Sequence, residues 1–368
     1  MNLDGYEEGK KSMRKVICLT ALSLILAMMP GCGERSVPLQ QYQRDNFVMD
    51  TLVHIQVYCP DGQIGQLALG AAFDEFSRIA DLSDKFAATN LSDPEISDVY
   101  RVNKNAGIKP VQVSDDTLVM LEKSLEYARL SDGAFDITVG PLMELWGFGQ
   151  GQYRLPAVNE VQSTLALVDY QQVVLDKQAR TVFLPVKGME IDLGGIAKGY
   201  ATDRAAQKLR QLGITSALIN AGGNVLAIGS KPDGSAWSTG IQDPRDKTKL
   251  IAVIKVKDRA VVSSGDYERC FFADGIRYHH ILDPSTGQPA RQLMAATIVA
   301  PGATEADLLS TTLFVLGTGP GMEMANKLTD VQVVFIDEQK NISISPSLEQ
   351  QIDFMAEGGY VHKMTGKD

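Results

Sequence analysis

The stretch Asp192-Leu193-Gly194-Gly195-Ile196-Ala197-Lys198-Gly199-Tyr200 joins a strand-like run to the start of a helix. Two adjacent glycines leave the backbone bare at the turn, so a ligand or metal can approach the main chain closely. The helix start beyond them has unpaired N–H groups that suit phosphate oxygens. An acid, a bare backbone and a lysine therefore meet at one corner, which indicates a nucleotide or pyrophosphate site. An ordinary turn with Asp192 as a cap accounts for the same residues about as well.

The composition is that of a folded globular protein. Of its 368 residues, 44% are hydrophobic and 22% are charged, enough for one large or two ordinary domains. The formal net charge of −10 argues against nucleic acid as a partner, because phosphate-backbone binding needs clustered Lys and Arg. The histidines and cysteines lack C-x-x-C or H-x-x-x-H spacing, which argues against a structural zinc site or an Fe–S cluster.

The N-terminus has the layout of a secretory signal peptide: four basic residues over 10–15, an apolar run over 16–29, then Pro30-Gly31-Cys32. Small residues before Cys32 are typical of a lipoprotein signal, in which that cysteine is acylated. The sequence predicts a lipoprotein signal peptide over 1–31, a tether over 32–45 and a folded domain over 46–365. The protein is expected to be exported and lipid-anchored through Cys32 on the extracytoplasmic side of the membrane. An uncleaved anchor is the alternative, although the run is short for a membrane span. Whether Cys59 and Cys270 pair stays open.

Helices and strands alternate along the rest of the chain. Apolar residues recur at helical spacing over 64–82, over 114–133 after an N-cap at Ser114, over 196–212 and over 304–317. Strand-like runs cover 47–58, 217–228, 278–282 and 297–300, and the runs 250–256 and 260–262 predict a hairpin around Asp258. The elements interleave without a strict βαβ period, so the predicted fold class is mixed α+β.

Three motifs stand together in the second half: D-L-G-G-I-A-K-G-Y from Asp192, H-I-L-D-P-S-T-G from His280 and E-A-D-L-L-S-T from Glu305. They follow M-D-T at Met49 and D-G-A-F-D at Asp132. In this order they closely resemble the ApbE family of FAD:protein FMN transferases. The resemblance runs from about 49 to 317 and implies a single catalytic unit of mixed sheets and packed helices, related to the T-fold, over 46–365.

The resemblance implies a Mg²⁺-dependent enzyme that cleaves FAD. The FMN half is attached through a phosphoester to a threonine of a target flavoprotein, and AMP is released. Two alternatives remain open: a Mg²⁺-dependent FAD pyrophosphatase that yields FMN and AMP, and a non-catalytic FAD-binding lipoprotein.

Metal contacts implied by the resemblance are the backbone carbonyl of Gly195 and the side chains of Asp307 and Thr311. Oxygen ligands suit a hard cation such as Mg²⁺, and residues four apart on a helix share a face. Purely structural roles are open to two of these residues as well. Thr304 and Asp307 have the spacing of a capping box, and the Thr311 hydroxyl could bond back to its own helix.

The implied FAD contacts are distributed along the chain. They are Met49, Ala134, Phe135, Asp136, Asp192, Lys198 and Ile281. Phe135 has an alternative role in the core, and Asp136 has one as a helix or turn cap.

His280 matches the family's active-site histidine, since a neutral imidazole beside a pyrophosphate can take a proton from the attacking hydroxyl. Asp283 is the second implied catalytic residue, as an orienting partner of His280 or as support for the metal. His279 is the less favoured catalyst.

One departure from the family pattern lies in the loop after the first helix. Asn90 stands where family members often have an aromatic that could stack on the cofactor. Stacking contributes on the order of 1 kcal/mol, so Asn90 predicts looser FAD binding and easier transfer to water.

Overall fold

The computed structural model describes residues 38–149, 151–355 and 358–363. The predicted signal peptide and the first part of the predicted tether, with Cys32, lie outside these residues. From Leu39 onward the chain forms one unit, built around a nine-stranded sheet. Its strands, in spatial order, are β1 (Gln40–Val48), β2 (Thr51–Cys59), β6 (Ser216–Ala221), β7 (Asn224–Ile228), β10 (Ala260–Gly265), β13 (Leu293–Ala300), β14 (Gln332–Asp337), β15 (Asn341–Ile344) and β17 (Val361–Lys363).

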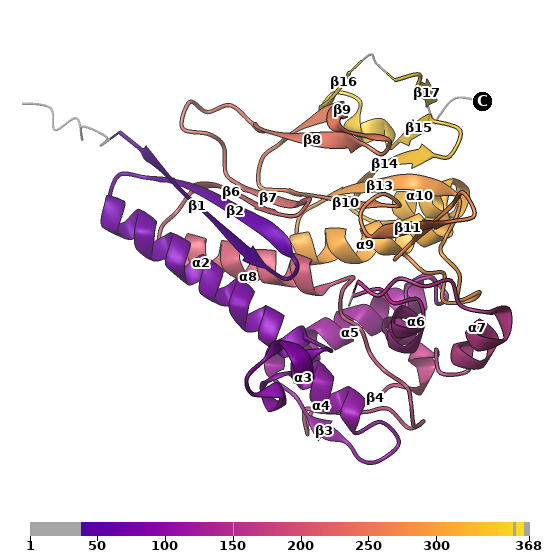
Figure 1. Cartoon of the computed structure of the whole chain (residues 1–368). Helices are drawn as coiled ribbons and strands as arrows, with labels where there is room; N and C mark the ends of the chain where they lie inside the picture. The colour runs from indigo at the N-terminus through magenta and orange to yellow at the C-terminus, as the bar shows by residue number, and fades with distance from the viewer. Residues whose placement is uncertain (1–37, 150, 356–357, 364–368) are drawn as a thin grey trace, which may run out of the picture. The chain divides into compact units, whose positions relative to one another are not determined.

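All neighbouring strands in this sheet are antiparallel except β15 and β17. Four helices cover one face (Figure 1): α2 (Gly62–Ser83), α8 (Ala197–Gln211), α9 (Ala303–Leu316) and α10 (Thr318–Lys327). Alternation in β2 accounts for the arrangement, because Val53, Ile55 and Val57 are fully buried toward the helices while the residues between them are not. The main core therefore lies between the sheet and these helices.

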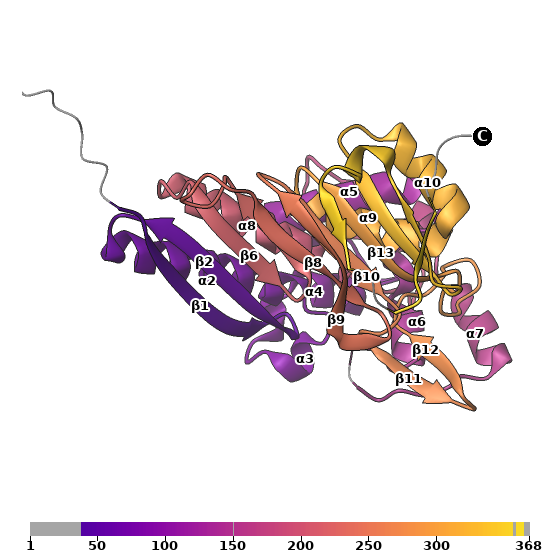
Figure 2. The same cartoon turned by 90° about the horizontal axis from the view of Figure 1, so that it is seen from above.

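A second core covers part of the opposite face of the sheet. Three strands form a small sheet there, in the order β16 (Ile352–Phe354), β9 (Asp246–Val256) and β8 (Trp237–Asp243). Trp237, Ile254 and Val256 pack against outward residues of the main sheet such as Val261 and Val299. Strands β10 and β13 are thus covered on both faces, as Figure 2 also shows from above.

Most of the remaining elements lie beside one end of α2 (Figure 1). They include α5 (Asp115–Leu130) and a third sheet in the order β3 (Val111–Gln112), β5 (Thr181–Phe183) and β4 (Val174–Asp176). A two-stranded hairpin is formed by β11 (Cys270–Ala273) and β12 (Ile276–His279). The short helices are α3 (Ala87–Asn90), η1 (Pro94–Ile96), α4 (Asp98–Lys104), η2 (Ile137–Val139), α6 (Gly140–Leu145), α7 (Val158–Leu165), η3 (Tyr170–Gln172) and η4 (Pro346–Leu348).

The long helices confirm the periodicity of the sequence, and Ser114 caps α5 by accepting from the N–H of Thr117. Several predictions were wrong. The runs 47–58 and 217–228 are not single strands, because turns at 49–50 and 222–223 divide them. Residues 40–45, expected in the tether, form the first part of β1, because their backbone pairs with β2 even though their side chains are polar. Strands β9 and β10 are not a hairpin. Strand β9 pairs with β8 and β16, whereas β10 pairs with β7 and β13.

Cys59 and Cys270 are both free thiols, the first in β2 and the second in β11. Among the described residues, no helix is both long enough and apolar enough to cross a membrane.

Candidate active site

One cavity of about 660 Å³ brings together most of the residues predicted for a site. Its walls come from the β1–β2 turn, the segment from α2 to α3, α6, the corner before α8, the end of β10, the base of the β11–β12 hairpin, and α9. The predicted residues on these walls are Met49, Asn90, Ala134, Phe135, Asp136, Asp192, Gly195, Lys198, His280, Ile281, Asp307 and Thr311.

The β1–β2 turn is fixed in place by a neighbouring turn. Met49 and Asp50 have φ angles of 54° and 56°, the left-handed conformation that a tight two-residue hairpin turn requires. A Cβ on Gly222, in the β6–β7 turn, would lie 2.0 Å from Thr51 Oγ1. Only glycine therefore allows the two turns to approach this closely, and the approach sets Met49 at the cavity wall.

Oxygen-bearing groups converge where α8 meets α9. Thr311 Oγ1 lies 3.5 Å from the position that a Cβ on Gly195 would occupy. Asp307 stands one turn before Thr311 on α9 and accepts a 2.8 Å hydrogen bond through Oδ2 from the N–H of Gly199. A Cβ on Gly199 would lie 2.7 Å from that of Asp307, so glycine permits this contact. The fold therefore brings the three predicted metal contacts to one corner.

These groups suit a hard cation. Asp307 is 4% exposed, and burial raises the pKa of its carboxyl despite the opposing effects of the Lys198 charge and the Gly199 N–H. Within the described residues, no set of three or more His, Cys, Asp or Glu side chains could hold a metal. A cation here would therefore take one carboxylate, a hydroxyl, a carbonyl and oxygens of a substrate, the donor set that Mg²⁺ prefers.

The capping role considered for Asp307 is wrong. The first N–H groups of α9 donate to Asp203 of α8, at 2.9 Å from Ala303 and 2.8 Å from Thr304. The carboxylate of Asp307 faces the cavity corner instead. Thr311 also differs from its neighbour: Thr312 bonds back to the carbonyl of Leu308 at 2.7 Å, whereas the Thr311 hydroxyl has no partner in the described chain.

Asp192 does not cap α8. Its Oδ1 accepts from the N–H of Gly194 at 2.8 Å and stabilises the turn, while α8 begins at Ala197 without a side-chain cap. Lys198 points back over this turn, with Nζ 3.4 Å from the carbonyl oxygen of Gly194. Its ammonium pairs with no carboxylate among the described residues, so it is available to a phosphate.

Phe135 and Asp136 shape the cavity while serving the fold. The Phe135 ring would lie 2.8 Å from a Cβ on Gly195, so the ring packs against the bare backbone of the corner. Asp136 is buried and accepts from the N–H and hydroxyl of Thr138, at 2.7 and 2.6 Å, and from the N–H of Tyr170 at 2.9 Å. Burial raises its pKa despite these bonds. The alternative role of Asp136 as a cap is thus confirmed, and its carboxylate has little capacity left for a ligand.

The two adjacent histidines have different environments. His279 is buried, donates through Nε2 to the carbonyl of Ala290 at 2.7 Å and accepts through Nδ1 from the N–H of Ile281 at 3.3 Å, so it is structural. Burial lowers its pKa to about 4. His280 lines the cavity, and its Nδ1 is buried without a partner among the described residues. Burial, followed by the charges of Arg269, His279 and Lys198, holds the pKa of His280 well below 6.5, so its imidazole is neutral.

Asp283 does not lie on the cavity wall, and it does not orient His280. Its Oδ1 accepts from the N–H and hydroxyl of Ser285, at 2.8 and 2.7 Å. Its backbone carbonyl accepts from the N–H of Gly287 at 2.8 Å. Asp283 therefore closes the turn that follows Ile281, which is the common role of aspartate in such a position. The predicted catalytic role of Asp283 is not supported by its position.

Several cavity residues were missed because no motif marks them. Lys85 Nζ lies 3.3 Å from Glu190 Oε2, 3.8 Å from Glu144 Oε1 and 4.0 Å from Asp192 Oδ2, and its side chain is 6% exposed. Phe86 and Arg269 also line the cavity. Asn90 is exposed and donates to Asp84 Oδ2 at 2.9 Å. Phe86 thus supplies an aromatic ring on the side of the cavity where the sequence suggested that Asn90 had removed one.

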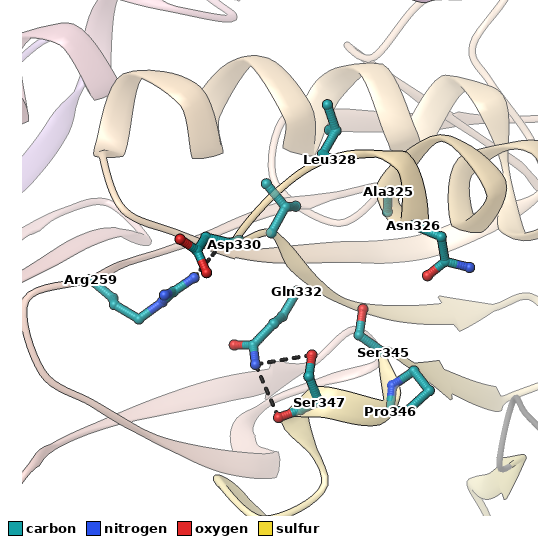
Figure 3. A pocket seen from close by; sticks show the side chains of 10 residues that line it. Arg259, Ala325, Asn326, Leu328, Asp330, Gln332, Ser345, Pro346 and Ser347 are labelled. Atoms are coloured by element: carbon teal, nitrogen blue, oxygen red, sulfur yellow. Dashed lines mark hydrogen bonds between the residues drawn. The ribbon is translucent and has the colours of Figure 1, made fainter.

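A second pocket, of about 460 Å³, lies among the end of α10, the start of β14 and η4 (Figure 3). Gln332 donates to the carbonyl and hydroxyl oxygens of Ser347, at 3.0 and 3.2 Å, and Arg259 donates to the carbonyl of Asp330. Gln332 Oε1 and Arg259 Nε are buried without partners in the described chain. None of the predicted residues lines this pocket, so it is separate from the candidate site.

The chain is similar to known proteins over most of its length. A family model described as the ApbE family matches residues 49–335. A FAD:protein FMN transferase from Treponema pallidum is 33% identical over 348 residues, which cover 90% of this chain and 94% of the relative. Another, from Klebsiella pneumoniae, is 37% identical over 251 residues, covering 68% of this chain and 78% of the relative.

Solved structures show the same fold. The crystal structure of the ApbE protein from Thermotoga maritima has a TM-score of 0.76 and 35% identity, covering 85% of this chain and 99% of that one. The flavin transferase ApbE from Vibrio cholerae has a TM-score of 0.75 and 27% identity, covering 85% of this chain and 100% of that one. The mixed α+β class predicted from the sequence is confirmed by these structures.

Proposed function

Because the chain belongs to the ApbE family, we propose that it is a FAD:protein FMN transferase that uses Mg²⁺ and attaches FMN to a threonine of a target flavoprotein. The observation that carries the proposal is the convergence of Gly195, Asp307 and Thr311 with Lys198 and His280 on one cavity. Phosphoryl transfer requires ligands for a metal ion, a positive charge for the phosphate oxygens and a base for the attacking hydroxyl, and these residues provide all three.

In the proposed reaction, the threonine hydroxyl attacks the phosphorus on the FMN side of the FAD pyrophosphate. The new O–P bond forms as the bond to the AMP phosphate breaks, and AMP departs with that electron pair. His280 accepts the hydroxyl proton, which it can do because its imidazole is neutral. Lys198 holds phosphate oxygens from the start of α8, and Asp307, Thr311 and the Gly195 carbonyl would hold Mg²⁺. When bound, Mg²⁺ neutralises charge on the pyrophosphate.

The test is an incubation of the full chain with FAD and Mg²⁺, with and without a flavoprotein domain that carries an acceptor threonine. We expect AMP release and covalent flavin fluorescence on the acceptor, both of which should be lost with EDTA. Release of AMP and FMN without transfer to any acceptor would support the pyrophosphatase alternative. FAD binding without cleavage would support a binding protein.

We also propose that the protein is exported and anchored by a lipid on Cys32. The proposal rests on the basic residues, the apolar run and the small residues that precede Cys32 in the sequence. The test is fractionation of cells that express the full chain. The wild type is expected in the membrane fraction, and Cys32→Ala is expected to leave it. Equal membrane association of both forms would contradict the lipid anchor.

A further inference from the structure

The β11–β12 hairpin places Arg269 beside His280. Its register pairs Cys270 with His279, and the N–H of His280 donates to the carbonyl of Arg269 at 3.0 Å. Arg269 and His280 are therefore directly opposite at the base of the hairpin. Residues in this relation project from the same face, with Cβ atoms about 5 Å apart. Both line the cavity.

Aromatic packing holds this hairpin in one position. The rings of Phe271 and Tyr278 stack with centroids 5.4 Å apart. Both rings pack against Trp146, with centroid distances of 6.4 Å for Phe271 and 5.5 Å for Tyr278. The indole N–H of Trp146 donates to the carbonyl of Gly287 at 2.9 Å. This bond connects the aromatic cluster beneath the hairpin to the turn after Ile281. Arg269 therefore lies on a hairpin that is held in place by packing. A residue that binds a substrate in a defined geometry needs such support.

The charge of Arg269 has no counterpart in the described chain. Some other half-buried arginines have carboxylate partners, such as Arg245 with Asp266 at 2.7 Å and Arg78 with Asp116 at 2.5 Å. The side chain of Arg269 is half-buried and makes neither an ion pair nor a hydrogen bond within the described residues. A partly desolvated, unpaired guanidinium is unfavourable until an anion fills the site. A guanidinium also matches phosphate oxygens through two parallel hydrogen bonds.

We propose that Arg269 is a catalytic residue that binds the phosphate under attack and stabilises the negative charge that develops on it. The inference rests on the proposed function. It names the FMN-side phosphate because Arg269 shares its face of the hairpin with His280, the base for the attacking hydroxyl. Arg269 stays protonated throughout: one O–P bond forms, one breaks, and the proton goes to His280. Lys198 meets the pyrophosphate from the start of α8.

Arg269 has a second effect on the same step. The groups that act on His280 are Arg269, Lys198 and His279, and Glu268 also lines the cavity. The positive charge of Arg269 disfavours protonation of His280, which helps to keep the imidazole neutral. Loss of this charge should therefore raise the pKa of His280 in the free protein.

The experiment compares Arg269→Gln and Arg269→Lys in the full chain. We expect Arg269→Gln to lower kcat for AMP release by about a hundredfold and to weaken FMN binding by about tenfold or more. Riboflavin, which has no phosphate, should bind unchanged. NMR of the ligand-free protein should show the pKa of His280 raised. Arg269→Lys should restore that pKa and only part of kcat, because an ammonium lacks the two-pronged geometry.

Arg277→Gln is the matched control. Arg277 lies on the same hairpin, over the ring of Phe272 and outside the cavity wall. We expect it to leave kcat and FMN binding unchanged. The inference is overturned if Arg269→Gln keeps kcat within twofold of wild type, or if it weakens riboflavin and FMN binding equally. A wild-type protein that neither cleaves FAD nor transfers FMN would contradict the proposed function instead, and FMN binding and the His280 pKa would still test the phosphate contact.

Discussion

Two polar clusters of this molecule differ in how their charges are paired. Between α2, α5 and α8, Arg78 contacts Glu75 at 2.6 Å and Asp116 at 2.5 Å, and Arg204 and Lys208 add further ion pairs. In the cavity, Asp307 and Arg269 form no ion pair within the described chain, and His280 Nδ1 has no hydrogen-bond partner there. The charges of the first cluster find their partners within the protein, whereas those of the second require a ligand. Charged groups that form ion pairs within the protein contribute to its stability, whereas unpaired groups in a cavity are candidates for binding and catalysis.

The strongest test of the cavity cluster is Asp307→Asn. The amide oxygen still accepts from the N–H of Gly199, so the fold should be preserved, but the carboxylate is lost. We expect AMP release to fall by a factor on the order of 10³, with Tm close to wild type. Because Asp307 is buried, Asp307→Ala should also destabilise the fold by leaving that N–H unpaired. Wild-type turnover by Asp307→Asn would contradict the metal assignment.

Gly195 tests the bare backbone of the corner. A Cβ there would lie 2.8 Å from the Phe135 ring, so even Gly195→Ala must displace the ring. Overpacking of about 1–3 kcal/mol at this position should lower AMP release by about tenfold or more. Gly195→Trp should abolish AMP release. Gly319→Ala is the control, since a Cβ there meets nothing within 4 Å. Normal turnover by Gly195→Trp would place the site elsewhere.

The paired cluster should respond in stability and not in chemistry. Burial acts to raise the pKa of Glu75 and Asp116, but Arg78 lowers both overall. Their folded pKa values lie below the unfolded ones, so the stabilisation is present above about pH 4.5 and is lost as pH falls through the folded values. Arg78→Met should lower the free energy of unfolding at pH 7 by about 1–2 kcal/mol, allowing for the exposure of Arg78.

Urea unfolding at pH 7 and pH 3 measures this effect, and the difference between Arg78→Met and wild type should shrink at pH 3. AMP release per folded molecule should not change. Lys327→Met is the control, because within the described residues Lys327 pairs only with Glu323, on the exposed face of α10. If Arg78→Met instead lowered turnover without lowering stability, the division between the two clusters would be wrong.

The smallest expected effect concerns Asn90. A tyrosine there could stack on the cofactor beside Phe86, a gain on the order of 1 kcal/mol or several-fold in affinity. Asn90→Tyr should therefore bind FAD more tightly and release AMP more slowly without an acceptor. Transfer to a protein threonine should suffer less, because the acceptor itself excludes water. Asn90→Gln is the control. Identical FAD affinity and hydrolysis in all three forms would place Asn90 away from the cofactor.

Helix periodicity and short motifs carried the sequence-based predictions. They located α2, α5, α8 and α9, and most of the residues that they singled out for a site line the cavity, because amphipathic spacing and motif order are local properties. Sheet partners are not local. Strands β9 and β10 resemble a hairpin along the chain, yet β10 is covered on both faces and β9 belongs to another sheet. Lys85 and Arg269 were missed for the same reason, since only folding brings these unmarked residues to the cavity.

The length of strand β1 sets the distance between the N-terminal end of the domain and the cavity. The preceding chain joins the domain at Gln40, while the opposite end of the strand carries the Met49–Asp50 turn on the cavity wall. A nine-residue strand spans about 30 Å. An attachment through the N-terminus would therefore join the domain about 30 Å from the Met49–Asp50 turn on the cavity wall. Under the proposed anchoring through Cys32, the length of the segment that precedes β1 would set how far from the membrane an acceptor threonine can lie.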